Sequence, residues 1–131
     1  MSLLDLFKSD EQRRKLSHLR NLVAVAFADG KLDNRETAML ATIMSHHGLN
    51  SSELKRCLNN PKGIKFVPPK DDYTKLCYLQ DMVLLMMCDG HIDEKEMIIC
   101  KATAIGLGYK KEVIDALILD TIKDMRQRMK E

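Results

Sequence analysis

Two short acidic motifs hold the side chains of this sequence that could do chemistry. Both read D-G-x-[LI]-D-x-x-E, and they supply six carboxylates: Asp29, Asp33 and Glu36 in the first, and Asp89, Asp93 and Glu96 in the second. Carboxylate oxygens are the ligands that calcium, magnesium and manganese prefer. These six residues are therefore the candidate site for a divalent cation or for a basic partner.

The motif matches only the second half of an EF-hand calcium loop. It supplies the fifth-position Asp, the sixth-position Gly, the eighth-position apolar residue, the ninth-position Asp and the twelfth-position Glu. Where that loop needs oxygen ligands at its first and third positions, the sequence has Val25 and Phe27 in one copy and Leu85 and Met87 in the other. A standard EF-hand is excluded. Waters, backbone carbonyls or the other motif would have to complete the shell of a cation.

The same residues also have a purely structural interpretation. The glycine of each motif suits the left-handed position that ends a helix, and the Asp and Glu three residues apart have the spacing of a capping box. Asp29 and Asp89 fit this less well. Each would lie at the C-terminal end of a helix, where the macrodipole disfavours an anion by roughly 0.3–1 kcal/mol. A bound cation, or a neighbouring Lys or Arg, would compensate, so metal binding and capping both stay open.

An internal repeat positions the two motifs. An ungapped offset places Lys15 to Leu58 on Lys75 to Ile118, and apolar residues recur at helical spacing before and after each motif. We predict an all-α fold of about seven helices, with two pseudo-repeated three-helix units and a short N-terminal helix around residues 2–7. The prediction is one domain over residues 1–131, with repeat one at about 10–59, a linker at about 60–71 and repeat two at about 72–131.

The linker, the cysteines and the methionines all have patterns that favour packing against or within an apolar core. The linker contains all three prolines, yet Ile64, Phe66 and Val67 should pack against the helices and keep it ordered. The four cysteines lie on apolar helical patterns with no C-x-x-C pairing, which favours buried, reduced thiols. The methionines have helical spacing, which favours core positions over a soft-metal or peptide groove.

Composition excludes several classes of function. A net charge of +2, with 45% apolar and 31% charged residues, is typical of a soluble protein and predicts no specific nucleic-acid partner. We expect no signal peptide and no transmembrane segment, which indicates a cytoplasmic protein, although the apolar start leaves peripheral membrane association open. No nucleophile motif, phosphate-binding loop or glycine fingerprint is present, so we do not expect an enzyme.

Three of the four histidines have a structural interpretation. His46 and His47 precede Gly48 near a predicted helix end, where positive charge is favourable, so capping is favoured over metal ligation. His91 lies in the second acidic motif and could join a transition-metal site. Because Lys31 occupies the matching position of the first motif, we interpret His91 as an exposed loop residue.

The sequence resembles the TerB family in three features. Each unit has a helix that ends in A-D-G or C-D-G, the next helix starts with [LI]-D-x-x-E, and the whole unit is duplicated. The members of this family are small helical proteins associated with tellurite resistance, and their domain is also similar to the N-terminal region of some DjlA-type membrane co-chaperones. The resemblance spans roughly Leu16 to Met125. It implies an all-α fold, a role in a stress-response or membrane-associated assembly, and metal binding by the six motif carboxylates. The sequence departs from the family in having Asn34 where a further acid is common, and it has no J-domain.

We therefore predict a non-catalytic, TerB-like helical binding module. Its paired acidic loops are expected to bind a divalent cation, with calcium, magnesium and manganese as the candidates, or a basic protein partner. The alternative is an interaction scaffold whose acids only cap helices, and a nucleic-acid binder that uses its basic termini is the third hypothesis.

Overall fold

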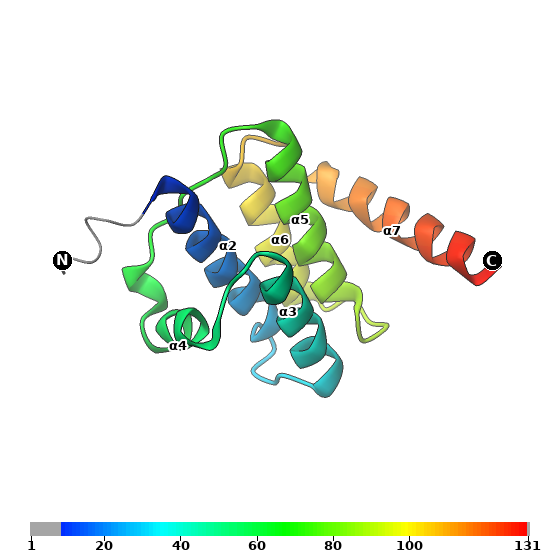
Figure 1. Cartoon of the computed structure of the whole chain (residues 1–131). Coiled ribbons are helices and arrows are strands. Elements are labelled where there is room, and N and C mark those ends of the chain that lie inside the picture. The colour runs from blue at the N-terminus through cyan, green and yellow to red at the C-terminus, as the bar shows by residue number, and fades with distance from the viewer. Residues whose placement is uncertain (1–8, 131) are drawn as a thin grey trace.

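The computed structural model of the chain describes residues 9–130, and within that part the chain is all-helical (Figure 1). The elements in order are α2 (Asp10–Ala26), α3 (Asn34–His46), α4 (Ser51–Asn59), the 3₁₀ turn η1 (Pro61–Gly63), α5 (Asp72–Met87), α6 (Glu94–Gly106) and α7 (Glu112–Lys130). The predicted all-α class is confirmed. The described residues hold six α-helices where about seven were predicted, and the residues of the predicted short helix at about 2–7 lie outside the described part of the chain.

The helices follow the repeat of the sequence. Helices α2, α3 and α4 come from the first unit and α5, α6 and α7 from the second, and α3 and α6 both have 13 residues that start directly after the Asp of their motif. Helix α2 packs against α3 and α4 of its own unit and against α5 and α6 of the other. Helix α5 packs in the matching way against α6, α7, α2 and α3. The two units therefore exchange equivalent contacts about α2 and α5, which lie at the centre.

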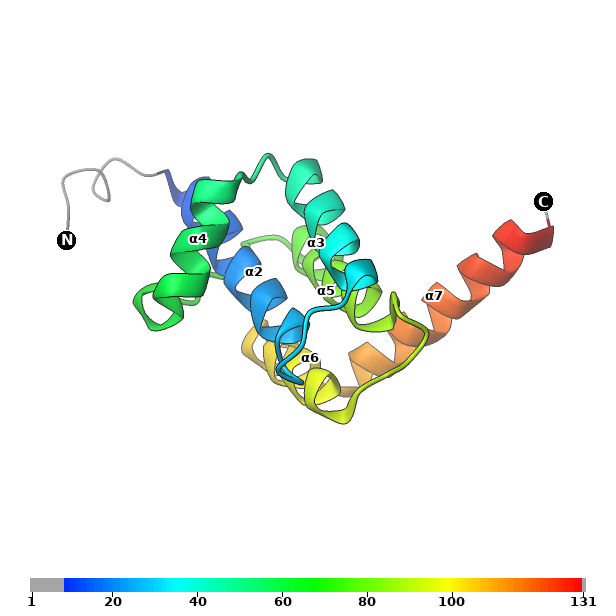
Figure 2. The same ribbon diagram turned by 90° about the horizontal axis from the view of Figure 1, so that it is seen from below.

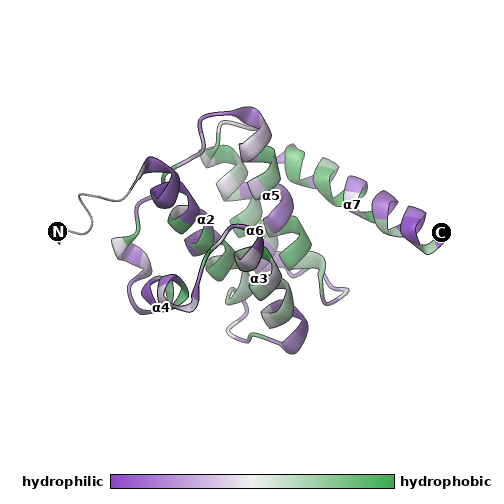
Figure 3. Ribbon diagram, viewed as in Figure 1, coloured by the Kyte–Doolittle hydropathy of each residue, from purple (hydrophilic) through white to green (hydrophobic). Residues whose placement is uncertain are grey.

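The core lies between these two central helices. Leu19 and Leu22 of α2 are fully buried, as are Leu79 and Met82 of α5, and Figure 3 shows apolar bands on the ribbons of both helices. Burying each such side chain contributes roughly 1.5–3 kcal/mol to the free energy of folding. Met82 and Met86 fill the core as the sequence predicted, whereas Met125 and Met129 are exposed on α7.

The four thiols are free, as predicted, but only Cys57 and Cys100 are fully buried. Cys77 and Cys88 are partly exposed. Burial raises the pKa of the Cys57 thiol to about 11 and that of the Cys100 thiol to about 12. Both thiols are protonated at neutral pH and are therefore weak nucleophiles.

The linker between the units is ordered by contacts with α2. Ile64 is buried, its carbonyl oxygen accepts a hydrogen bond from Arg20 Nη1 at 3.0 Å, and the Val67 backbone N–H donates to Ser17 Oγ at 2.9 Å. Phe66 remains 39% exposed, although its ring lies beside Gly106 of α6. The expected packing holds for Ile64 and only in part for Phe66.

Helix α7 packs on α5 and α6 through its first half and then extends away from the other helices (Figures 1 and 2). Ile114, Ile118 and Thr121 are buried, and every residue from Lys123 to Lys130 is exposed. Within residues 9–130, none of the helices combines the length and the apolar character needed to cross a membrane.

Candidate metal centre at the paired acidic loops

The two acidic loops have the same backbone geometry because they have the same glycine. Gly30 has a φ angle of +82° and Gly90 one of +85°, a left-handed conformation that residues with a Cβ rarely adopt. Just before each glycine, an Asp side chain bonds to the backbone beyond it. Asp29 Oδ1 accepts from the Lys31 N–H at 3.0 Å, and Asp89 Oδ1 accepts from the His91 N–H at 2.9 Å.

These two hydrogen bonds answer part of the question that the sequence raised about Asp29 and Asp89. Compensation was expected from a cation or from a Lys or Arg side chain, but the backbone N–H two residues on satisfies one oxygen of each carboxylate. Such Asx turns are a common use of Asp in loops. They leave the negative charge of each side chain in place, so the electrostatic cost at the helix end is not removed.

The Asp at the start of the following helix acts as a cap, as the capping interpretation predicts. Asp33 Oδ1 accepts from the Glu36 N–H at 2.8 Å. Asp93 Oδ1 accepts from the Lys95 N–H at 2.8 Å and from the Glu96 N–H at 3.3 Å. Each bond satisfies a donor that the first turn of a helix leaves free, and such a cap contributes typically about 1 kcal/mol.

Capping does not account for the two glutamates. A capping box with both bonds formed occurs at the start of α4, between Asn50 and Glu53, whereas α3 and α6 have only the bond to the capping Asp. Glu36 and Glu96 are each only 3% exposed. Among the described residues, Glu36 Oε2 is a buried oxygen with no hydrogen-bond partner in the protein. A buried, unpartnered carboxylate oxygen is costly and therefore calls for a ligand.

Tertiary packing brings the two motifs together. The ligand atoms of Asp29, Glu36 and Glu96 lie within 4.8 Å of one another, and so do those of Asp33, Glu36 and Asp89. Each group combines both repeats, and Glu36 belongs to both. Five of the six predicted site residues thus converge, and the sixth, Asp93, serves as the cap of α6.

The convergence raises the pKa of both buried glutamates. Burial raises the pKa of Glu96 to about 8, and the charges of Glu36, Asp89, Asp93 and Asp29 add to the rise. Burial likewise raises the pKa of Glu36, with further contributions from Asp33, Asp29 and Asp89, while the Asp33 backbone N–H lowers it by a smaller amount. The charged side chains behind these two shifts are all acidic. A cation would be attracted to this concentration of negative charge.

One basic side chain connects the two loops through a hydrogen bond that does not involve their carboxylates. Arg35 Nη1 at the start of α3 donates a hydrogen bond at 3.0 Å to the backbone carbonyl oxygen of Asp89. This bond fixes the end of α5 against the start of α3, and its acceptor is a carbonyl, not a carboxylate. Cys88 lies beside the same loops. Burial raises the pKa of its thiol to about 11, and the charges of Asp89 and Glu36 add to the rise.

The structure also reveals a polar cluster that the sequence analysis did not find. His47 is the C-terminal cap residue of α3 through its backbone N–H, and its side chain meets His18 and Asp81, which had been assigned no role. No motif signals this cluster, because its members come from three helices. His91 is exposed, as predicted.

Comparison of the chain with protein-family models, with curated proteins and with solved structures found no match. The resemblance to the TerB family therefore rests on the motifs and on the repeat, and the functional argument rests on the site's own geometry.

Proposed function

We propose that the chain is a non-catalytic, TerB-like binding module whose paired acidic loops bind a divalent cation of the hard class, namely calcium, magnesium or manganese. The observation that carries this proposal is the pair of buried glutamates, Glu36 and Glu96, which the fold holds together among three further carboxylates. Carboxylates held this close repel one another when ionised. A cation between them replaces repulsion by attraction.

The spacing of the oxygens suits such an ion. Calcium binds oxygens at 2.3–2.6 Å, so that ligands on opposite sides of the ion lie about 4.6–5.2 Å apart. The ligand atoms of Asp29, Glu36 and Glu96 fall within 4.8 Å. Magnesium, with bonds near 2.0–2.1 Å, requires a tighter and more regular shell. The flexible geometry of calcium therefore fits these loops best, with waters completing the coordination.

The competing hypothesis of a scaffold makes a different prediction about the same residues. If the acids only cap helices, Asp33 and Asp93 matter for stability and the two glutamates have no ligand to bind. The unpartnered Glu36 Oε2 and the raised pKa of Glu96 favour cation binding over this scaffold. A basic side chain from a protein partner could satisfy the same carboxylates, and it would compete with the cation.

Nucleic-acid binding has weaker support. The exposed C-terminal half of α7 carries Lys123, Arg126, Arg128 and Lys130, but Asp120 and Asp124 are exposed on the same helix. Binding through such a surface would fall steeply with salt, whereas cation binding by the loops depends on their carboxylates.

The test is calorimetric titration and thermal unfolding with calcium, magnesium and manganese. The parent is compared with a Glu36→Gln, Glu96→Gln double variant, and with an Asp120→Asn, Asp124→Asn double variant that removes two carboxyl groups from an exposed surface. At about 100 times the dissociation constant, a cation should stabilise the parent by about 2.7 kcal/mol, a shift of several degrees. The α7 variant should keep this shift and the Glu variant should lose it. An equal response of all three proteins would refute the assignment of the site.

A variant with Asp29→Asn and Asp89→Asn separates charge from fold. Asn keeps a side-chain oxygen for the hydrogen bonds to the Lys31 and His91 N–H groups, so the loops retain their geometry while two charges are lost. Weaker cation binding with an unchanged fold supports electrostatic attraction by the loops.

A further inference from the structure

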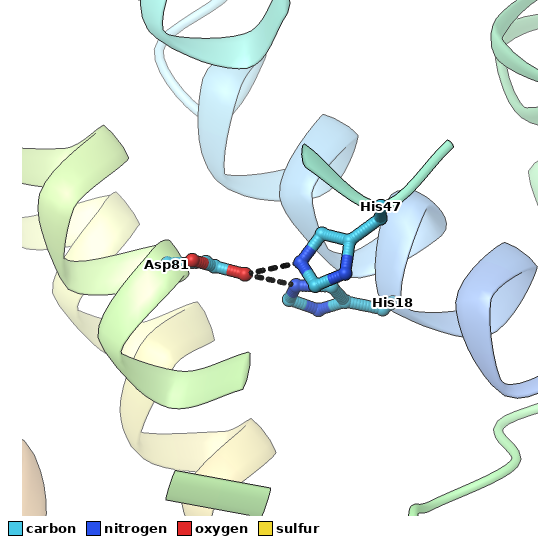
Figure 4. Close-up of polar contacts among 3 residues, drawn as sticks. All are labelled: His18, His47 and Asp81. Atoms are coloured by element: carbon cyan, nitrogen blue, oxygen red, sulfur yellow. Dashed lines mark hydrogen bonds and ion pairs between the residues drawn. The ribbon is translucent and has the colours of Figure 1, made fainter. Parts of the chain in front are cut away.

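A compact cluster of two histidines and one aspartate lies apart from the residues of the acidic loops. His18 comes from the middle of α2, His47 from the C-terminal cap of α3 and Asp81 from α5. Their Nε2 and Oδ2 atoms meet at one point: Asp81 Oδ2 lies 2.9 Å from His18 Nε2 and 2.8 Å from His47 Nε2 (Figure 4). Two imidazole nitrogens thus share a single carboxylate oxygen.

The rings are held rigidly in this arrangement. His18 is only 2% exposed, and its ring stacks on Tyr78 with a centroid distance of 3.8 Å and an interplanar angle of 4°. The ring of His47 meets Tyr78 edge-on at 5.5 Å and His18 at 5.2 Å. Such fixed orientations lower the cost of ordering ligands around a metal.

We propose that His18, His47 and Asp81 form a transition-metal site that takes Zn²⁺, separate from the cation site of the acidic loops. Two imidazoles and a carboxylate are a ligand set that suits borderline metals, whereas calcium and magnesium prefer oxygen alone. Three protein ligands leave a fourth tetrahedral position for water or for a group from a partner.

The distances allow the ion with a small adjustment. Zinc binds histidine nitrogen and carboxylate oxygen at about 2.0–2.2 Å, which places neighbouring tetrahedral ligands about 3.3–3.5 Å apart. The three ligand atoms now lie within 4.8 Å of one another, and the two nitrogen to oxygen distances must each open by about half an ångström. Each Nε2 gives up the proton of its hydrogen bond, which moves through solvent to Nδ1 of the same ring, so a neutral imidazole stays neutral.

The protonation states of the cluster suit this exchange. Burial lowers the pKa of His18, and the hydrogen bond and charge of Asp81 oppose that change by less. Burial raises the pKa of Asp81, but the hydrogen bonds and the charges of His18 and His47 together more than offset it, and the net shift is downward. A neutral imidazole and an ionised carboxylate are the forms that bind zinc.

The internal repeat does not produce a second copy of this cluster. At the offset of the two units, His18 corresponds to Tyr78, Asp81 to Asn21 and His47 to Leu107, so the ligand set occurs once. His47 and Tyr78 also line a surface hollow of about 350 Å³, through which an ion could reach the cluster from solvent.

The test is titration of the full chain with Zn²⁺, and with Co²⁺ as a visible-absorption probe of coordination. We expect one ion per chain, with affinity lowered at least about tenfold in His47→Asn and in Asp81→Asn. His46→Ala is the matched control, since His46 is the exposed neighbour of His47 and should leave binding unchanged. The Glu36→Gln, Glu96→Gln variant should also bind Zn²⁺ normally, which separates this site from the acidic loops.

A second measurement needs no variant and remains decisive if a substitution unfolds the protein. Long-range ¹H–¹⁵N spectra of the histidine rings should show Zn²⁺ shifting Nε2 of His18 and His47, while His46 and His91 stay unchanged. Absence of Zn²⁺ binding by the parent overturns the proposal. So does binding that survives in His47→Asn or that shifts only His46 and His91.

Discussion

Replacing Glu96 by Gln should stabilise the metal-free protein at alkaline pH. In the folded chain the pKa of Glu96 is raised to about 8 from its ordinary value of 4.5, first by burial and then by its acidic neighbours. Between these two values the folded chain holds a proton that the unfolded chain has released. Stability therefore falls as the pH rises through this window, and the stabilising contribution of protonation is lost above about pH 8.

The size of the effect follows from the shift. Each pKa unit corresponds to about 1.4 kcal/mol, and solvent that reaches the exposed Asp29 screens part of the repulsion. We expect Glu96→Gln to raise the free energy of unfolding by roughly 1–3 kcal/mol at pH 8.5 and to change it little at pH 5, where Glu96 is protonated in the fold. Gln has nearly the same shape and carries no charge, so packing should be preserved.

The assay is urea unfolding between pH 5 and pH 8.5 in the presence of a chelator, for the parent, for Glu96→Gln and for Asp124→Asn. Asp124 is an exposed acid of α7 and serves as the control for loss of one charge. Added calcium should reverse the order, because it stabilises the parent and not Glu96→Gln. If Glu96→Gln is less stable than the parent at pH 8.5, or if both lose stability with pH at the same rate, the electrostatic account of the site is wrong.

Two further predictions concern the fold that positions the site. Met82→Ala removes a fully buried side chain between α2 and α5 and should cost about 2–5 kcal/mol in urea unfolding, whereas Met129→Ala, at an 87% exposed residue, should cost less than about 0.5 kcal/mol. Ser17→Ala leaves the Val67 N–H without its acceptor, so it should lower the free energy of unfolding by about 1–3 kcal/mol and speed amide exchange at Val67. Ser45→Ala, on the exposed side of α3, should change neither the stability nor the exchange rate. Equal stability of the two members of either pair would contradict the assigned packing.

The acidic site combines a local and a non-local part. The caps of α3 and α6 and the left-handed glycines depend on residues within a few positions of one another, and the motif predicts them directly. The burial of Glu36 and Glu96 does not follow from the motif, since the same spacing at Asn50 and Glu53 gives an exposed capping box. The difference arises because the acidic loops face each other across the two units.

The histidine cluster shows more clearly which contacts cannot be predicted from the sequence. His47 pairs with a residue 34 positions away and His18 with one 63 positions away, and both partners are the same Asp81. Helical periodicity records which face of a helix is apolar, but it contains no information about which polar residue meets another on a different helix. A buried polar position at Ser17 and His18, inside the otherwise apolar face of α2, was the one signal available.

The sequence by itself determined the all-α class, the duplication, the helix starts at the two acidic motifs and the exclusion of an EF-hand, because each depends on residues close together in the chain. Val25 and Leu85, which stand where that calcium loop needs ligands, are indeed buried in helices. Only the tertiary structure decided that five acidic side chains converge and that His18, His47 and Asp81 meet. Both sites depend on how α2 and α5 pack, and that packing is fixed by the shape of the whole apolar core between the two units, to which side chains from all six helices contribute.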